Sequence, residues 1–125
     1  MAEPKRVASN RTRQHRIEQE IVVDACTSGE RAIGWHCRLD DKLRFPFKAK
    51  CVIVRKISPL GKGEEVEVLG MAPADDCMRE MFVLVRFAAR KLGVPLAQLE
   101  PIGAGAATRE AVEDWRYWVA MGYGF

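Results

Sequence analysis

The sequence predicts an α+β fold, in which a small antiparallel β-barrel is flanked by two N-terminal helices and one C-terminal helix. Three observations support this fold class. Apolar residues recur at helical spacing in residues 17–43, alternate with polar residues at a period of two between residues 47 and 102, and return to helical spacing in residues 108–120. Because several short strands separated by turn residues usually curl into a barrel, we expect the middle segment to close on itself.

Length and composition indicate one soluble domain. The chain has 125 residues and a mass of 14.1 kDa, which suits a single hydrophobic core. No apolar run approaches the roughly 18 residues that span a bilayer. The N-terminus lacks the apolar segment of a secretory signal, so we expect a cytoplasmic, reducing compartment. There the four cysteines should remain thiols, at positions Cys26, Cys37, Cys51 and Cys77.

Positive charge is concentrated at the N-terminus. Residues 1–16 hold five cationic side chains against Glu3, so the total formal charge of +3 leaves −1 for residues 17–125. The segment is polar and poor in apolar residues, which predicts a disordered, solvated tail. A nucleic-acid-binding arm is the less favoured interpretation, because no aromatic residues lie between the charges to stack on bases. The single domain is therefore expected to span residues 17–125.

Two helices are expected before the barrel. Residues 17–25 have the apolar spacing of a short amphipathic helix. Ser28 is suited to cap the second helix, which should run to about Asp41. The segment Phe45-Pro46-Phe47 ends that helix, since proline disfavours a helical residue before it, and its two aromatic rings are expected to enter the core.

Short alternating segments then predict the strands of the barrel. In the second strand, Val66 and Val68 lie on one face, while Glu65 and Glu67 lie on the other, which we interpret as the wet face of the sheet. A turn-rich connection over residues 58–63 precedes this strand. The expected strands are residues 49–54, 64–69, 81–87 and 92–96, followed by a single helical turn at residues 97–99.

A glycine and alanine linker, residues 103–107, separates the barrel from the last helix. Thr108 is expected to cap this helix. Its apolar stripe should consist of Val112, Trp115, Trp118 and Val119, and two tryptophans provide too much apolar area to be left in water. The helix is therefore expected to pack on the barrel or on the early helices.

Motifs distributed over most of the chain resemble one known family. The resemblance extends in order from about residue 16 to the C-terminus, and only the basic tail lies outside it. The motifs are Trp35, Leu39–Leu43, Phe45–Cys51, Ile57–Leu60, Gly63–Val68, Gly70–Ala72, Cys77, Glu80–Val83, Val94–Leu96, Leu99–Pro101, Glu113–Trp115 and Tyr117-Trp118. On these residues the chain is similar to the cyanobacterial calcium-binding protein family, the CcbP-like proteins. The resemblance implies an SH3-like antiparallel β-barrel with flanking helices, and a calcium-buffering role that is established for some members.

Two acidic groups could supply the oxygen atoms that a calcium ion requires. Calcium takes about six to eight oxygens from carboxylates, carbonyls and water. Asp40 and Asp41 come where the second helix ends, beside carbonyls that this end leaves unpaired. Asp75, Asp76 and Glu80 lie in the loop between two strands. The resemblance implies a site made of Asp41 and this loop, with Asp40 assisting, so the two groups are expected to converge in space.

Basic residues near both acidic groups support a competing interpretation. Each nearby cation opposes a divalent ion by Coulomb repulsion. The carboxylates would then be solvated residues in surface ion pairs, worth roughly 0 to 1 kcal/mol each. The flanking cations are Arg38, Lys42, Arg44, Lys48 and Arg79.

Two other kinds of binding protein are also compatible with the sequence. An SH3-like module could bind a protein partner through exposed aromatic residues such as Phe45, Phe47 and Tyr123. Nucleic-acid binding by the barrel and the basic tail is the third possibility, and the net charge of −1 outside the tail argues against it.

Catalysis is not expected. The sequence has no C-x-x-C pair, no EF-hand loop and no Walker-type phosphate loop. His36 and Cys37 are adjacent, so they point to different sides of a helix, and the cysteines are better interpreted as buried small hydrophobes. His15 belongs to the predicted tail. The sequence therefore favours a non-catalytic calcium-binding protein, with a protein-interaction module as the alternative.

Overall fold

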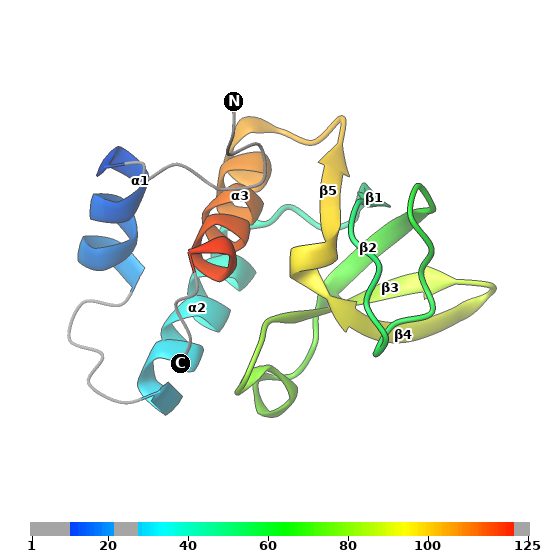
Figure 1. The fold of residues 1–125 in the computed structure, drawn as a ribbon, viewed down its shortest axis with the longest axis horizontal. Coiled ribbons are helices and arrows are strands. Elements are labelled where there is room, and N and C mark those ends of the chain that lie inside the picture. Colours follow the sequence, from blue (N-terminus) through cyan, green and yellow to red (C-terminus); the bar gives the residue numbers. More distant parts are fainter. Residues whose placement is uncertain (1–10, 22–27, 122–125) are drawn as a thin grey trace, which may run out of the picture.

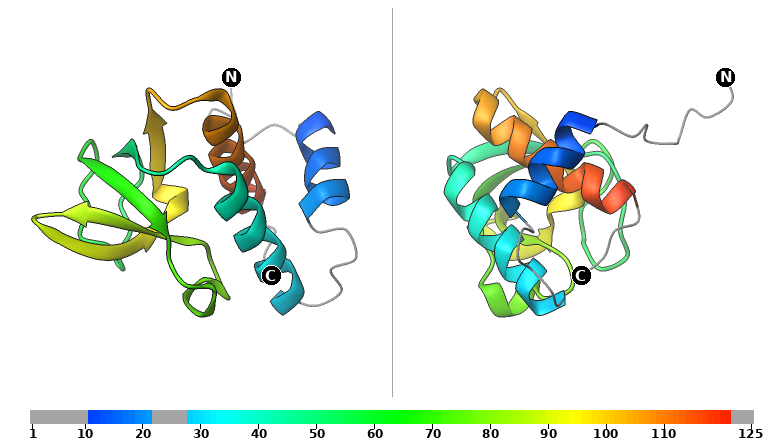
Figure 2. Two further views of the ribbon diagram at one scale, coloured as in Figure 1. Left: turned by 180° about the vertical axis from the view of Figure 1, so that it is seen from behind. Right: turned by 90° about the vertical axis from the view of Figure 1, so that its left-hand side faces the viewer.

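Helices and sheet lie on opposite sides of the molecule. The computed structural model describes residues 11–21 and 28–121. Figure 1 shows α2 and α3 between α1 and the sheet, and the views of Figure 2 agree. Within the described residues, no helix is both long and apolar enough to cross a membrane. The helical elements are α1 (Arg11–Arg16), the π-helical turn η1 (Ile17–Ile21), α2 (Ser28–Lys42) and α3 (Ala106–Ala120).

The N-terminal helix begins before the position that the sequence predicts. The prediction of a solvated tail is wrong for residues 11–16, which form α1, while residues 1–10 lie outside the described part of the chain. The predicted helix over residues 17–25 is described only to Ile21, in π-helical form. The second helix is confirmed, since α2 ends one residue after Asp41.

A buried carboxylate explains why α1 is folded. Asp114 on α3 is 1% exposed. Its Oδ1 accepts hydrogen bonds from Arg13 at 2.6 Å and from Arg16 at 2.7 Å, and its Oδ2 accepts one from Arg16 at 3.0 Å. The hydrogen bond with Asp114 is the main cause that raises the pKa of Arg16, so this guanidinium stays charged at any working pH. Arg13 and Arg16, which the sequence assigns to the predicted solvated tail, therefore attach α1 to α3.

Five antiparallel strands form one sheet in the order β4-β3-β2-β1-β5. The described pairings do not join β4 to β5, so closure into the predicted SH3-like barrel is not confirmed. The α+β class and the antiparallel strands are confirmed. The elements are β1 (Phe47–Cys51), β2 (Glu65–Met71), the 3-10 turn η2 (Ala74–Cys77), β3 (Phe82–Phe87), β4 (Arg90–Pro95), the 3-10 turn η3 (Leu96–Gln98) and β5 (Leu99–Ile102).

The alternation of β2 places its side chains as the sequence predicts. Val66 and Val68 are buried, whereas Glu67 lies on the outer face opposite Arg86, 3.2 Å from its Nε. The first strand differs from its predicted range of residues 49–54: it begins at Phe47 and ends at Cys51. The chain beyond it leaves the sheet and forms a loop.

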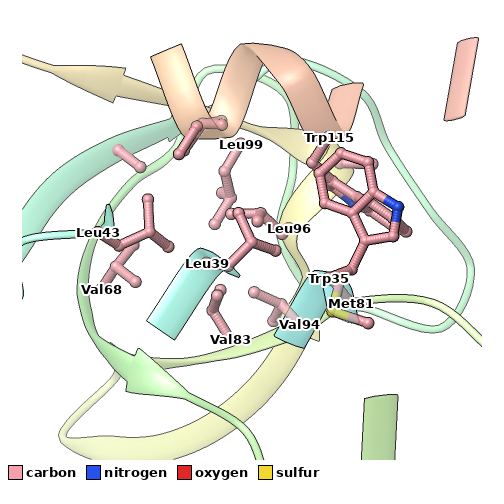
Figure 3. Packing of buried hydrophobic residues seen from close by; sticks show 14 of the residues in the cluster. Trp35, Leu39, Leu43, Val68, Met81, Val83, Val94, Leu96, Leu99 and Trp115 are labelled. Carbon is pink, nitrogen blue, oxygen red and sulfur yellow. The ribbon is translucent and has the colours of Figure 1, made fainter. Parts of the chain in front are cut away.

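Buried side chains from α2, α3 and the sheet form one hydrophobic core (Figure 3). At its centre Trp35 contacts Trp115 edge to face, with ring centroids 5.0 Å apart, and Trp118 at 5.6 Å. Val112, Trp115 and Trp118 are buried as predicted, but Val119 is exposed. The stripe is therefore one residue narrower than the sequence suggests, and it packs α3 against α2.

The prediction that both aromatic rings beside Pro46 enter the core is confirmed in part. Phe47 is buried, and Phe45 is half-buried and stacks on it at 5.9 Å. Thr108, in contrast, does not cap α3, because the helix already begins at Ala106. The Thr108 hydroxyl is buried and accepts a hydrogen bond from the backbone N–H of Arg44 at 3.0 Å. This hydrogen bond attaches the segment that follows α2 to α3.

Gly34 allows α2 to approach η1 closely. A Cβ atom at this position would lie 2.6 Å from the backbone oxygen of Ile21, which is shorter than any normal contact. We expect Gly34→Ala to lower the free energy of unfolding by about 1–3 kcal/mol, because backbone must move to relieve the overlap. Urea unfolding measures this effect. The matched control is Gly93→Ala, where an added Cβ meets no atom within 4 Å, and equal losses for both variants would contradict the close contact.

Asp114 gives a second stability prediction. Asp114→Asn would leave the largely buried Arg13 and Arg16 without their shared carboxylate, so we expect a loss of about 2–4 kcal/mol and faster amide exchange in α1. The control is Glu113→Gln, because the contact between Glu113 and Arg13 is longer, at 3.5 Å, and Glu113 is half-exposed. It should cost less than about 1 kcal/mol. Unchanged protection of α1 in Asp114→Asn would refute the role of this carboxylate.

Candidate metal site

Two adjacent carboxylates lie on a turn with a fixed backbone. Asp75 and Asp76 belong to η2, which connects β2 to β3, and both are exposed. The turn closes on itself, since the N–H of Asp76 donates to the oxygen of Pro73 at 2.9 Å. At its far end Cys77 and Met81 are both fully buried. The two carboxylates therefore lie on an anchored loop between two strands, where the sequence predicts them.

Cys77 anchors this turn and does not act as a metal ligand. The N–H of Phe82 donates to its sulfur at 3.3 Å. Burial is the main cause that raises the pKa of the Cys77 thiol, and the charge of Asp76 adds to it. The thiol therefore stays protonated at neutral pH, whereas a metal requires the thiolate.

The other cysteines fit the predictions in part. Cys37, Cys51 and Cys77 are free thiols in the structure, as expected. Cys51 and Cys77 are buried small residues, but Cys37 is exposed, so the expectation of burial is wrong for Cys37. It lies on the solvent face of α2, one residue from His36. Cys26 lies outside the described residues.

His36 connects α2 to the acidic loop. Its Nε2 lies 2.8 Å from the backbone oxygen of Ala72. A carbonyl oxygen can only accept, so Nε2 carries the proton and this nitrogen cannot also bind a metal. Together with Cys77, His36 fixes the loop in place and leaves the binding of a hard cation to oxygen atoms.

Glu80 is held by an arginine from another loop. Its two carboxylate oxygens each accept a hydrogen bond from Arg55, both at 2.8 Å. These hydrogen bonds are the main cause that raises the pKa of Arg55. Glu80 therefore lies in the predicted acidic loop, but both of its oxygens are bonded to a guanidinium.

The second acidic pair lies elsewhere. Asp40 and Asp41 are exposed in the last turn of α2. In Figures 1 and 2 the turn η2 lies towards the opposite end of this helix, where α2 begins. Among the described residues, no three His, Cys, Asp or Glu side chains come close enough together to hold a metal ion. The expected convergence of Asp41 with the loop of Asp75, Asp76 and Glu80 is therefore not found.

One of the cations near Asp40 and Asp41 forms an ion pair with another carboxylate. Arg38, one turn earlier on α2, pairs with Glu20 of η1 at 2.9 Å. The C-terminal end of a helix carries partial negative charge, which favours a cation beside these two aspartates. This pair therefore forms a second, separate acidic position.

Exposed apolar residues occur where the sequence predicts a strand. Ile53, Val54 and Ile57 are 49%, 61% and 58% exposed in the loop between β1 and β2. The aromatic residues suggested for a protein partner do not form such a surface, since Phe47 is buried and Phe45 stacks on it. Tyr123 lies outside the described residues. The continuous apolar run of residues 51–54 conceals this loop from sequence analysis.

Comparison with known proteins identifies relatives over nearly the whole chain. A family model, Calci_bind_CcbP, described as calcium binding, matches residues 15–119. The crystal structure of Anabaena CcbP is 43% identical, with a TM-score of 0.84, over 95% of this chain and 98% of that one. A calcium-binding protein solved in its calcium-binding form is also 43% identical, with a TM-score of 0.81, over 95% of this chain and 100% of that one. No curated protein sequence matches the chain.

Proposed function

This chain belongs to the CcbP family of calcium-binding proteins, and we propose from that membership that it binds Ca²⁺ without catalysing a reaction. The observation that carries the proposal is the match over residues 15–119, together with 43% identity to a protein solved in its calcium-binding form. The proposal extends the property of these relatives to this chain. It also includes a calcium-buffering role through carboxylate and backbone oxygens.

We assign the principal site to the turn that carries Asp75 and Asp76. Calcium accepts oxygen ligands at about 2.3–2.6 Å and completes its shell with carbonyls and water. Both carboxylates are exposed, and the ion pairs of the described residues include neither of them. Their backbone is held by the buried Cys77 and by the hydrogen bond of Asp76 to Pro73. The donor chemistry therefore suits a hard cation.

Ligand charge supports a weak site. Only two free carboxylates belong to the turn, and calcium affinity falls as fewer charged ligands surround the ion. We therefore place the dissociation constant on the order of 10⁻⁴ to 10⁻³ M, the weak end of the range over which ligand charge and site rigidity tune protein calcium sites. Such a site suits binding and release at high local calcium concentration.

Asp41, assisted by Asp40, supplies a second and weaker position. The partial negative charge of the C-terminal end of α2 adds to the two carboxylates. Lys42 and Arg44 follow them directly in the sequence and oppose a divalent ion. We therefore rank this pair below the turn of Asp75 and Asp76.

The non-catalytic part of the proposal rests on the state of the nucleophilic groups. Cys77 is buried and protonated, and His36 donates to a backbone oxygen. In this arrangement Cys77 is not the thiolate that nucleophilic attack requires, and Nε2 of His36 is engaged as a donor. The same two groups instead hold the acidic turn.

Removing the carboxylates of the turn tests the proposed site. We expect Asp75→Asn with Asp76→Asn to weaken calcium binding at least about tenfold by isothermal titration, because the neutral amides lose both charged ligands. The matched control, Asp40→Asn with Asp41→Asn, should change the principal binding event by less than about threefold. Unchanged affinity in the first variant would remove the turn as the site. A wild-type protein that releases no heat at millimolar calcium would contradict the proposed function itself.

A further inference from the structure

An open cavity lies where the start of β1, the end of β5 and the start of α3 meet. Its volume is about 450 Å³, which is in the range of small-molecule sites. In Figure 1 the chain passes from the end of β5 into the first turn of α3 at the top of the view. None of the residues that line the cavity belongs to the acidic loop of residues 74–81. The cavity is therefore separate from the proposed calcium site.

Positive charge in the lining of this cavity is not neutralised by carboxylates. Arg44 and Lys48 both line the cavity and are exposed, and the ion pairs of the described residues include neither of them. Lys48 lies opposite Glu67 on β2 and Ile102 on β5. Glu67 also lines the cavity, but its carboxylate accepts a hydrogen bond from Arg86 at 3.2 Å. Two cations therefore remain for an anionic ligand.

A buried hydroxyl supplies a further donor to the same cavity. Thr108 lines the cavity and is only 1% exposed. Its oxygen accepts a hydrogen bond from the backbone N–H of Arg44 at 3.0 Å. Its own proton is donated to no group among the described residues. Since a buried hydroxyl normally uses its proton in a hydrogen bond, this group points to an acceptor inside the cavity.

The first turn of α3 adds backbone donors. Its N-cap residue is Gly105, which lines the cavity and has no side chain with which to cap the helix. The first N–H groups of a helix have no partner inside the helix, so they can donate to a ligand. The cations, the hydroxyl and these N–H groups are all donors, and they come from three separate segments of the chain.

We propose that this cavity binds a phosphate group, either as inorganic phosphate or as the phosphate of a small ester. A phosphate offers several acceptor oxygens and negative charge, which match the charged donors Arg44 and Lys48, the Thr108 hydroxyl and the helix N–H groups. The volume leaves room for the body of an ester beside Pro46 and Ile102. The site does not have the pattern of a Walker-type loop, because its cations do not follow the glycines in sequence.

The same strand provides a matched control for Lys48. Lys50 lies opposite Glu65 on β2 and Glu100 on β5, so it has a carboxylate neighbour on each side. It is also absent from the lining of the cavity. A general effect of removing one lysine from β1 would act at both positions, whereas an effect on the proposed site should act at Lys48 alone.

Phosphate titration of the calcium-free full-length chain tests the proposal. At an ionic strength held constant with sodium chloride, inorganic phosphate and glycerol 3-phosphate should each shift the amide NMR resonances of Ala106 and Ala107 to saturation. Lys48→Gln should weaken this binding at least about fivefold, because it removes a charged donor. Lys50→Gln should change it less than about twofold, since its charge lies outside the cavity and is screened.

A substitution at Gly105 separates loss of the site from loss of the fold. Aspartate is among the preferred N-cap residues, and in Gly105→Asp its carboxylate would accept the free N–H groups of α3 and repel a phosphate. The backbone of Gly105 is extended (φ −67°, ψ 167°), and an added Cβ meets no atom within 4 Å. We therefore expect at least about a tenfold loss of phosphate affinity, with a thermal unfolding temperature equal to or above that of the wild type.

The outcomes distinguish the two sources of the phosphate and a failure of the inference. Tighter binding of glycerol 3-phosphate than of inorganic phosphate would identify an ester as the ligand, and equal binding would show that the phosphate group alone is recognised. Amide shifts that do not saturate, or that Lys48→Gln and Lys50→Gln weaken equally, would overturn the inference. Unchanged phosphate affinity in Gly105→Asp would also overturn it. Since no calcium is present, such a failure leaves the proposed calcium binding intact.

Discussion

The pairing of arginines with carboxylates determines which acidic side chains of this protein are available to an ion. In the described residues Asp114 is shared by Arg13 and Arg16, Glu80 is held by Arg55, and Glu20 by Arg38. The same interaction has two consequences. Where the carboxylate is buried, as in Asp114, it attaches one helix to another. Where it belongs to the acidic loop, as in Glu80, both carboxylate oxygens are bonded to a guanidinium.

This pairing accounts for the way in which the chain differs from an acidic calcium-binding protein. Its formal net charge is +3, so cations outnumber carboxylates and occupy several of them. Asp75 and Asp76 project from an exposed turn, and the ion pairs of the described residues include neither of them. A weak ion site can therefore exist on a basic protein without a dedicated cage of ligands.

Local patterns in the sequence predict most of the fold, because each reports on a single element. The helical spacing before Asp41, the alternation around Val66 and the tryptophans of α3 all lie where they were expected. The start of β4 was missed for a local reason. The turn before it is made of Ala88 and Ala89, both with positive φ (52° and 65°), whereas such turns are usually recognised by glycine or asparagine.

The candidate site was predictable only as far as it is local. Asp75 and Asp76 are adjacent in sequence, so their joint position on one turn follows from the pattern. The bond between Arg55 and Glu80 crosses 25 residues, and that between Arg16 and Asp114 crosses 98. Nothing in either segment marks its partner. The resemblance to the family implies that Asp41 lies at the loop, and only the path of α2 shows that its last turn lies apart from η2.

The most direct measurement is a crystal structure of the protein saturated with calcium, in which anomalous scattering locates the ion. The account predicts an ion bound by oxygens of Asp75 and Asp76 at about 2.3–2.6 Å. An ion bound elsewhere, with Asp75 and Asp76 free of it, would contradict the assignment of the site to this turn.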